Sequence, residues 1–206
     1  MDFATKNDDI YNMKTLYIFL IIICSSQAIF AEDADSLFDN NTAFYEGKSY
    51  SYIIAPPENF KMNSEEATDD GYSFAFIPKA EKYSQASIII GINIFKIKAS
   101  KDSSFTLDKL ISFDTTSARE HFGKDVEISE VKAIETATTD KLRTIYFNSD
   151  AGIIPNVMMS YFDGKSEIII FELNITDRIA RFQAEQIYLE CLQQIKILTK
   201  GKLEVG

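Results

Sequence analysis

Apolar positions recur with a strand period in some segments and a helix period in others, and these segments predict seven strands and two helices. Period-two alternation or short continuous apolar runs indicate strands, and apolar residues at helical spacing indicate helices. The expected strands span residues 50–54, 71–78, 86–99, 126–135, 141–148, 156–162 and 166–175, and the expected helices span 104–123 and 177–198. The order is therefore three strands, a helix, four strands and a helix.

Two of the early strands carry more specific expectations. Tyr72, Phe74 and Phe76 alternate with smaller residues and should share one face of the second strand. The run 86–99 is rich in β-branched residues, so we expect it to lie centrally in the sheet and to be buried on both faces. Gly91 within this run indicates a bulge or the close approach of another element.

Turn and cap residues mark several element ends. The dipeptide Asp163-Gly164 predicts a two-residue hairpin, because both central positions of a type I′ turn need positive φ. Either Ser104 or Thr106 is expected to cap the first helix at its N-terminus, and Gly123 is placed to end it.

The element order predicts an α+β fold in a single domain. Strands joined by short turns imply mainly antiparallel pairing, and each amphipathic helix needs an apolar surface to cover. We therefore expect one antiparallel sheet of about six to seven strands covered by two main helices. The domain should span residues 49–200, with a flexible lead-in at 32–48, a polar loop at 59–70 and a tail at 201–206.

The N-terminal region predicts export. From Met13, one lysine precedes an apolar run at residues 16–24, which is too short for the roughly 20 residues that a membrane-spanning helix needs. Cleavage is expected after Ala31, or alternatively after Ala28, so residues 1–31 would be upstream sequence and signal peptide. The residues before Met13 carry three acids and one lysine, the wrong charge for the start of a signal, so Met13 is the expected start.

A lipoprotein anchor is the alternative interpretation of this region. Cys24 follows the apolar run, but Ile23 stands where lipid-attachment signals have Gly, Ala or Ser. We therefore expect a periplasmic or secreted protein, with no stable membrane span after signal removal.

Composition narrows the function classes. With 206 residues, 46% of them hydrophobic, and a net charge of -10, the chain is globular and acidic, which argues against nucleic-acid binding. One histidine and two cysteines leave little material for a zinc site or a histidine-based catalytic centre. Signal removal would leave Cys191 as the single cysteine, so no intramolecular disulfide is expected. No metal or cofactor is predicted.

The chain resembles the Mog1/PsbP-like superfamily, which includes DcrB-like and LpqN-like exported bacterial proteins. The resemblance rests on YSYIIAPPENF, GYSFAFIP, SIIIGINIFKI, TLDKLISFDTTSAREHF, a four-strand meander with the turn DG, and FQAEQIYLECLQQIKIL. It covers nearly the whole mature chain. It implies an α/β/α sandwich and an adaptor, assembly or envelope-accessory role, and it implies no catalytic residues.

Two residues could support nucleophilic or acid–base chemistry. His121 falls in the last turn of the first helix, where a surface histidine is favoured by the helix dipole. Cys191 could be a thiol nucleophile with His121 as its base, but its place between Ile187 and Ile195 on the apolar stripe favours a buried structural cysteine.

Acidic residues offer two further possibilities. The segment 65–70 could hold Ca²⁺, but it lacks the spacing of an EF-hand and is expected to be a solvated loop. No GxSxG, GxxxxGK[ST], HExxH or GxGxxG motif occurs. A carboxylate pair suited to the hydrolysis of an envelope polymer stays open as an alternative, because spatial separations are not visible in a sequence.

Aromatic residues near the start of the domain give the one hint of a binding surface. Tyr50 and Tyr52 fit a strand that faces the core, whereas Phe44, Tyr45 and Phe60 are candidates for contact with a partner. The leading hypothesis is an exported, non-enzymatic binding or assembly accessory of the cell envelope, whose partner is another envelope or secreted protein. The alternatives are the carboxylate hydrolase and a secreted virulence factor.

Overall fold

A computed structural model describes residues 42–97, 106–123, 126–148, 157–175 and 181–200 of the chain. Its strands form two antiparallel sheets. The large sheet has the order β3 (Phe60–Asn63), β4 (Phe74–Pro78), β5 (Ile88–Lys96), β9 (Glu167–Ile175), β8 (Val157–Asp163), β7 (Lys141–Asn148) and β6 (Glu127–Glu135). The small sheet has the order β1 (Ala43–Glu46), β2 (Tyr50–Ile54) and β10 (Lys196–Thr199).

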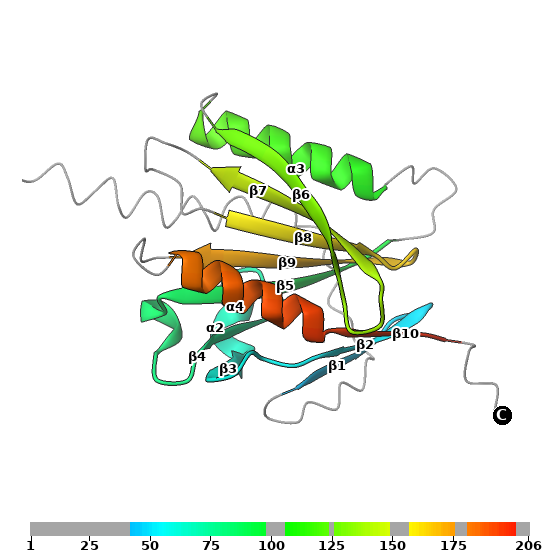
Figure 1. The fold of residues 1–206 in the computed structure, drawn as a ribbon, viewed down its shortest axis with the longest axis horizontal. Coiled ribbons are helices and arrows are strands. Elements are labelled where there is room, and N and C mark those ends of the chain that lie inside the picture. The colour runs from blue at the N-terminus through cyan, green and yellow to red at the C-terminus, as the bar shows by residue number, and fades with distance from the viewer. Residues whose placement is uncertain (1–41, 98–105, 124–125, 149–156, 176–180, 201–206) are drawn as a thin grey trace, which may run out of the picture.

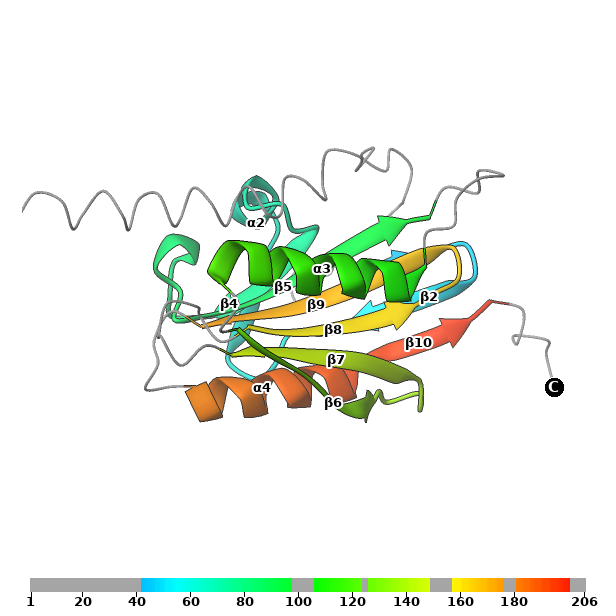
Figure 2. The same cartoon turned by 90° about the horizontal axis from the view of Figure 1, so that it is seen from above.

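Helices cover both faces of the large sheet, which confirms the expected α+β class and the α/β/α sandwich (Figures 1 and 2). Helix α4 (Arg181–Gln194) lies on one face, and α3 (Leu107–Phe122) lies on the other with the short helix α2 (Glu65–Asp69) and the 3-10 turn η1 (Tyr83–Gln85). Alternation along β9 explains this arrangement. Phe171 and Leu173 join the core under α4, while Ile168 and Ile170 join the core under α3.

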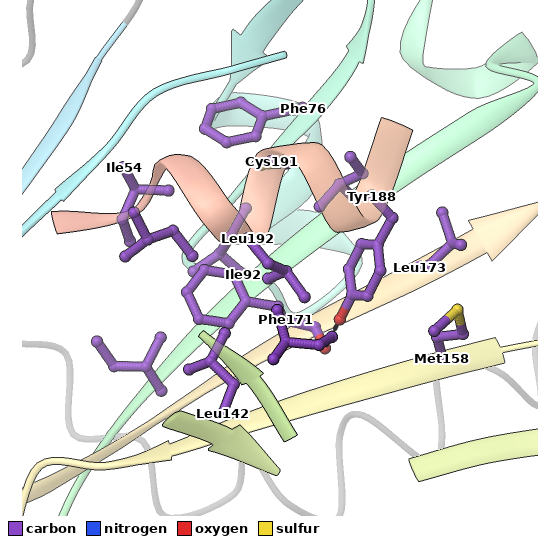
Figure 3. Close-up of a cluster of buried hydrophobic side chains, with 14 of the residues drawn as sticks. Ile54, Phe76, Ile92, Leu142, Met158, Phe171, Leu173, Tyr188, Cys191 and Leu192 are labelled. Carbon is purple, nitrogen blue, oxygen red and sulfur yellow. Dashed lines mark hydrogen bonds between the residues drawn. The ribbon is translucent and has the colours of Figure 1, made fainter. Parts of the chain in front are cut away.

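The larger core lies between α4 and the sheet (Figure 3). Leu192 and Cys191 are fully buried there and pack with Phe171 and other apolar side chains of the sheet. The hydroxyl of Tyr188 donates to the carbonyl oxygen of Phe171 at 2.9 Å, so this buried tyrosine leaves no unpaired polar group. Helix α4 is thus held mainly by apolar burial.

Gly91 allows another part of the chain to approach β5 closely, which is one of the two structural roles that the sequence predicted for it. A Cβ at this position would lie 2.2 Å from a ring carbon of Tyr72, so the ring rests directly on the backbone of β5. This contact also corrects the expected second strand. Phe74 and Phe76 face the α4 side, but Tyr72 precedes β4 and packs on the α3 side.

Helix α3 begins and ends where its sequence predicts. The side chain of Thr106 accepts from the backbone N–H of Lys109 at 3.3 Å. Gly123 follows the helix with φ 96°, a conformation that favours glycine. Thr106 is therefore the N-cap, and Gly123 ends the helix.

Two segments expected to be irregular contain regular elements. The last part of the lead-in 32–48 forms β1, because residues 43–46 pair with β2. The predicted loop 59–70 contains β3 and α2, and β3 pairs with β4 at the edge of the large sheet. Both strands are four residues long, too short for a periodicity to be recognised.

The second predicted helix, 177–198, is wrong at its C-terminal end. Helix α4 ends at Gln194, and the residues that follow form β10, which pairs with β2. Ile195 and Ile197 are both buried and flank the exposed Lys196, which is a period of two. Pairing with a distant strand stabilises this extended conformation and outweighs the helical spacing of Ile195 and Leu198.

The predicted hairpin between β8 and β9 is present, but its turn differs from type I′. Positive φ occurs at Lys165 (67°) and not at the expected dipeptide. The N–H of Gly164 donates to the carbonyl of Glu167 at 2.8 Å, and the N–H of Lys165 donates to the side chain of Asp163 at 2.9 Å. These contacts give a longer turn, Asp163–Glu167.

Some predictions concern residues that the structure does not describe. The signal segment 1–31 with its cleavage site at Ala31, most of the lead-in, and the tail 201–206 lie outside the described residues. Among the helices that are described, none has the length and apolar character of a membrane span.

Candidate functional site

The outer face of the small sheet exposes apolar side chains from three neighbouring strands of the described part of the chain. Tyr45, Tyr52 and Ile197 point inward against the larger core. Alternation therefore turns the intervening residues outward. This outer face consists of Phe44 and Glu46 on β1, Ser51 and Ile53 on β2, and Lys196 and Leu198 on β10, with Lys200 just beyond.

Strand register brings the apolar members of this face together. Phe44 on β1 lies directly opposite Ile53 on β2. Leu198 on β10 lies opposite Ser51, two residues before Ile53, so Leu198 is a diagonal neighbour of Ile53. Leu198 is 42% exposed, and Phe44 and Ile53 are partly exposed. Directly opposed and diagonal neighbours on one sheet face are close enough to touch, so the three side chains form one apolar patch.

Charged side chains surround the patch. The Nζ of Lys200 lies 2.5 Å from a carboxylate oxygen of Glu46, so this ion pair spans β2 from one edge strand to the other. Lys196 lies opposite Ile53 on the same face. An apolar centre with a charged border is the usual anatomy of a protein interface.

The structure separates the three aromatic residues predicted to bind a partner. Phe44 lies on the outer face, as a contact residue would. Tyr45 lies on the inner face and packs against Tyr52, with ring centroids 5.8 Å apart. Phe60 is 4% exposed and belongs to the core, so its proposed partner contact is incorrect.

Two members of the outer face were not predicted from the sequence. Ile53 was placed in a core-facing strand without a role, and Leu198 was assigned to the apolar stripe of a helix. The alternation of Ile195, Lys196 and Ile197 was the available signal for a strand that turns Leu198 outward.

A buried carboxylate attaches the small sheet to the large one. Glu167, at the start of β9, is 2% exposed and accepts a hydrogen bond from the hydroxyl of Tyr52 at 2.8 Å. The hydroxyl of Ser166 donates to the other carboxylate oxygen. Burial, reinforced by this hydrogen bond, raises the pKa of Tyr52 above its usual value, so the phenol stays protonated as the donor.

Two glycines make this attachment possible. A Cβ at Gly47 would lie 2.2 Å from a carboxylate oxygen of Glu167, and a Cβ at Gly164 would lie 2.4 Å from the hydroxyl oxygen of Tyr52. Any larger residue would have to displace the hydrogen-bonded pair. Tyr50 and Phe162 add an edge-to-face ring contact at 5.5 Å between the same two sheets.

The β6–β7 turn holds the far edge of β10. The hydroxyl of Thr138 accepts from the N–H of Ile197 at 3.0 Å and donates to the carboxylate of Asp140 at 2.7 Å. The N–H of Ala137 donates to the carbonyl of Ile195 at 3.0 Å. The outer face is therefore supported on its inner side and at one edge, and it is a rigid surface before any partner binds.

The other large apolar side chains exposed in the described residues lie on three different elements. Phe113 is on α3, Val131 on β6 and Phe182 on α4. Apolar residues exposed singly are normal on protein surfaces and need no functional explanation.

A second polar feature lies beneath α3. The carboxylate of Asp114 accepts from the hydroxyl of Tyr161 at 2.9 Å. Burial raises the pKa of Asp114 to about 7; the Tyr161 hydrogen bond opposes this shift and the nearby Glu172 adds to it. Burial also raises the pKa of Glu172, which lies on the central strand β9. Asp114 therefore changes charge near neutral pH.

These two carboxyls relate to the proposed hydrolase, which stays a prediction. A glycosidase pair needs one protonated and one ionised carboxyl, both able to reach the substrate. Glu172 is almost fully buried in the sheet, and the pKa values of Glu172 and Asp114 are shifted in the same direction. This pair therefore gives the hydrolase no support.

The fold places the one candidate Cys/His pair in different layers. Cys191 lies in α4 and position 121 lies in α3, with the large sheet between them. The side chain of His121 is outside what the structure describes. Burial raises the pKa of Cys191 to about 12, so its reactive thiolate form is scarce at neutral pH.

We predict that a thiol reagent such as dithionitrobenzoate reacts with Cys191 far more slowly in native protein than in protein unfolded in guanidinium. The thiol must be exposed before it can ionise and attack. The release of thionitrobenzoate, followed by absorbance, measures both rates. Equal rates in the two states would contradict the buried structural role.

The acidic segment 65–70 does not form a recognisable metal site. It is mostly helix α2, and the side-chain oxygen of Asn63, which precedes the helix, accepts from the N–H of Glu66 at 3.1 Å. Within the described ranges, no group of three or more His, Cys, Asp or Glu side chains is arranged to hold a metal ion.

Comparisons with known proteins give a similarity of fold. No protein-family model matches the sequence, and no curated protein gives a significant match. The solution structure of cyanobacterial PsbP (CyanoP) from Synechocystis sp. PCC 6803 is similar, with a TM-score of 0.46 and 10% sequence identity over 81% of this chain and 98% of that one. The similarity is one of fold and says nothing of what the present chain binds.

Proposed function

We propose that this protein is a non-enzymatic binding or assembly accessory of the cell envelope, and that it contacts another protein through the outer face of the small sheet. The observation that carries the proposal is the apolar patch of Phe44, Ile53 and Leu198, exposed on a sheet that is fixed in place from its inner side. The export part rests on the signal-like N-terminal sequence alone.

The energetics favour a contact role for this face. The chain keeps an exposed leucine and two partly exposed apolar side chains in one place. Because Leu198 is 42% exposed, covering it recovers less than half of the about 1.5–3 kcal/mol that complete burial contributes, and the partly exposed Phe44 and Ile53 recover a smaller share. A partner that covers the patch recovers this free energy on binding. Because Tyr52 and Glu167 already hold the sheet rigid, little conformational entropy is lost when the partner docks.

Site-specific photo-crosslinking in the native host tests this function. We expect p-benzoylphenylalanine at position 53 of the full chain to give a discrete adduct with one protein after irradiation. The control is the same probe at Gln193, which is exposed on α4, on the opposite side of that helix from the core. Adducts of equal yield from both positions, or none from position 53, would rule out the outer face as the contact surface.

A further inference from the structure

Building on the proposed function, we infer that the partner of the outer face is an acidic protein segment, in which carboxylates border an apolar side chain. The partner is recognised by the lysines around the patch together with the patch itself. Three features lead to this inference: the local excess of positive charge, the spacing of the lysines along β10, and the absence of internal ion pairs at two of them.

The surroundings of the patch are basic in an acidic protein. The chain as a whole has a formal net charge of -10. Among the described residues around the outer face, however, three lysines, Lys48, Lys196 and Lys200, accompany two acids: Glu46, which pairs with Lys200, and Asp140, which lies at the edge of β10 beside Thr138. Local potential decides which groups can be placed beside a surface, because screening limits a charge to about 8 Å at physiological ionic strength. A carboxylate beside this face is therefore attracted even though the whole molecule is acidic.

Two of these lysines remain available for a partner. Lys200 is paired with Glu46, whereas Lys196 and Lys48 are exposed and form no ion pair within the described part of the chain. A carboxylate that docks at Lys196 would pair with it without first breaking an internal ion pair. Complementary charges of this kind select a partner and its orientation.

Strand geometry specifies the spacing of groups on the partner. Lys196, Leu198 and Lys200 follow one another at every second residue, so they lie on one side of β10 about 6.6 Å apart. An extended segment that runs along β10 would place an acid at Lys196 and an apolar residue at Leu198, and a second acid two residues further on would share Lys200 with Glu46. The apolar residue would contact Leu198 and Ile53.

The binding of short labelled peptides to the full chain tests this inference. The probe carries two copies of Glu-Ser-Leu-Ser-Glu, and the comparison peptides replace each Glu with Gln or with Lys. Fluorescence anisotropy at physiological ionic strength should show binding of the acidic peptide at least about tenfold tighter than that of the Gln peptide, and no binding of the Lys peptide.

Charge reversal on the protein provides the matched control. Lys196→Glu should lower the affinity for the acidic peptide at least about tenfold, because it replaces an attraction with a repulsion at the docking position. Lys82→Glu, at an exposed lysine beside η1, makes the same change in net charge and should leave the affinity unchanged. Equal weakening by both variants would show a response to net charge alone and would overturn the inference.

Other occupants of the face give distinct results. The inference of an acidic partner would be overturned if all three peptides bound equally or if the acidic peptide did not bind. It would also be overturned if the protein sedimented with vesicles of anionic phospholipid, or if it formed a dimer that Leu198→Asp abolished. Crosslinking from position 53 is independent of the partner's charge. A crosslinked partner whose contact segment is basic would therefore overturn this inference and leave the proposed function standing.

Discussion

Replacing Leu192 with alanine should lower the free energy of unfolding by about 2–5 kcal/mol. This side chain is fully buried between α4 and the large sheet, where it packs near Phe171 and Ile92 (Figure 3). Truncation removes apolar contacts and leaves a cavity that the rigid sheet cannot fill. Urea denaturation followed by circular dichroism measures the change.

The control for this prediction is Leu198→Ala, at the other end of the same C-terminal region. Leu198 is 42% exposed on the outer face, so its truncation should change stability by no more than about 0.5 kcal/mol. If the two alanine variants lose the same stability, then the assignment of Leu192 to the core and Leu198 to the surface is wrong. A stable Leu198 variant also allows binding to be studied without loss of the fold.

Asp114→Asn should remove a large part of the pH dependence of stability. Asp114 has an ordinary pKa near 3.8 when unfolded and a pKa of about 7 in the folded protein, so the folded state binds the proton more tightly. The contribution of Asp114 to stability is therefore highest at and below about pH 4, falls as the pH rises, and reaches its lower limit above about pH 7. A shift of about three units corresponds to a loss of up to about 4 kcal/mol.

The asparagine variant is neutral at every pH and can still bond with the hydroxyl of Tyr161. It should therefore be more stable than the original protein at pH 8, by up to about 4 kcal/mol, and nearly equal to it at pH 4. Glu172, whose pKa burial also raises, contributes a slope of the same sign that this variant keeps.

Urea denaturation at pH 4, 6 and 8 measures this effect. Glu120→Gln is the matched control, since it neutralises an exposed acid on the same helix and should keep the original slope. An unchanged slope in Asp114→Asn would mean that the carboxyl is ionised in the folded protein at all three pH values. Burial would then not raise the pKa of Asp114 in the folded protein.

The fold class followed from local patterns because those patterns reflect which face of an element is buried. The apolar runs of β7 and β8 indicate strands buried on both faces, and the helical spacing in α3 indicates one buried face; Leu142 and Phe162 belong to the core under α4, and Ile145 and Tyr161 belong to the core under α3. The caps of α3 were equally local, since Thr106 bonds within its own first turn. Such features depend on residues a few positions apart, so they are visible in the sequence.

The candidate site was only partly predictable from the sequence, because it depends on contacts between residues far apart in the chain. Phe44, predicted as a possible contact, lies on the outer face, but Phe60 is in the core, and Leu198 belongs to a strand where a helix was predicted. Each error concerns a four-residue strand, in which the period of two repeats only twice. At that length, the partner strand decides the conformation more than the residues themselves do.

The amino-acid pattern alone was therefore sufficient for an acidic α+β protein with antiparallel strands and two main helices. It could not place 43–46 beside 50–54, nor 196–199 on the other side, because hydrogen bonding between strands joins residues far apart in the chain without a local signal. Tertiary folding created the small sheet, buried Glu167 against Tyr52 beneath it, and turned Leu198 outward. The surface proposed to bind a partner exists only because distant segments of the chain meet there.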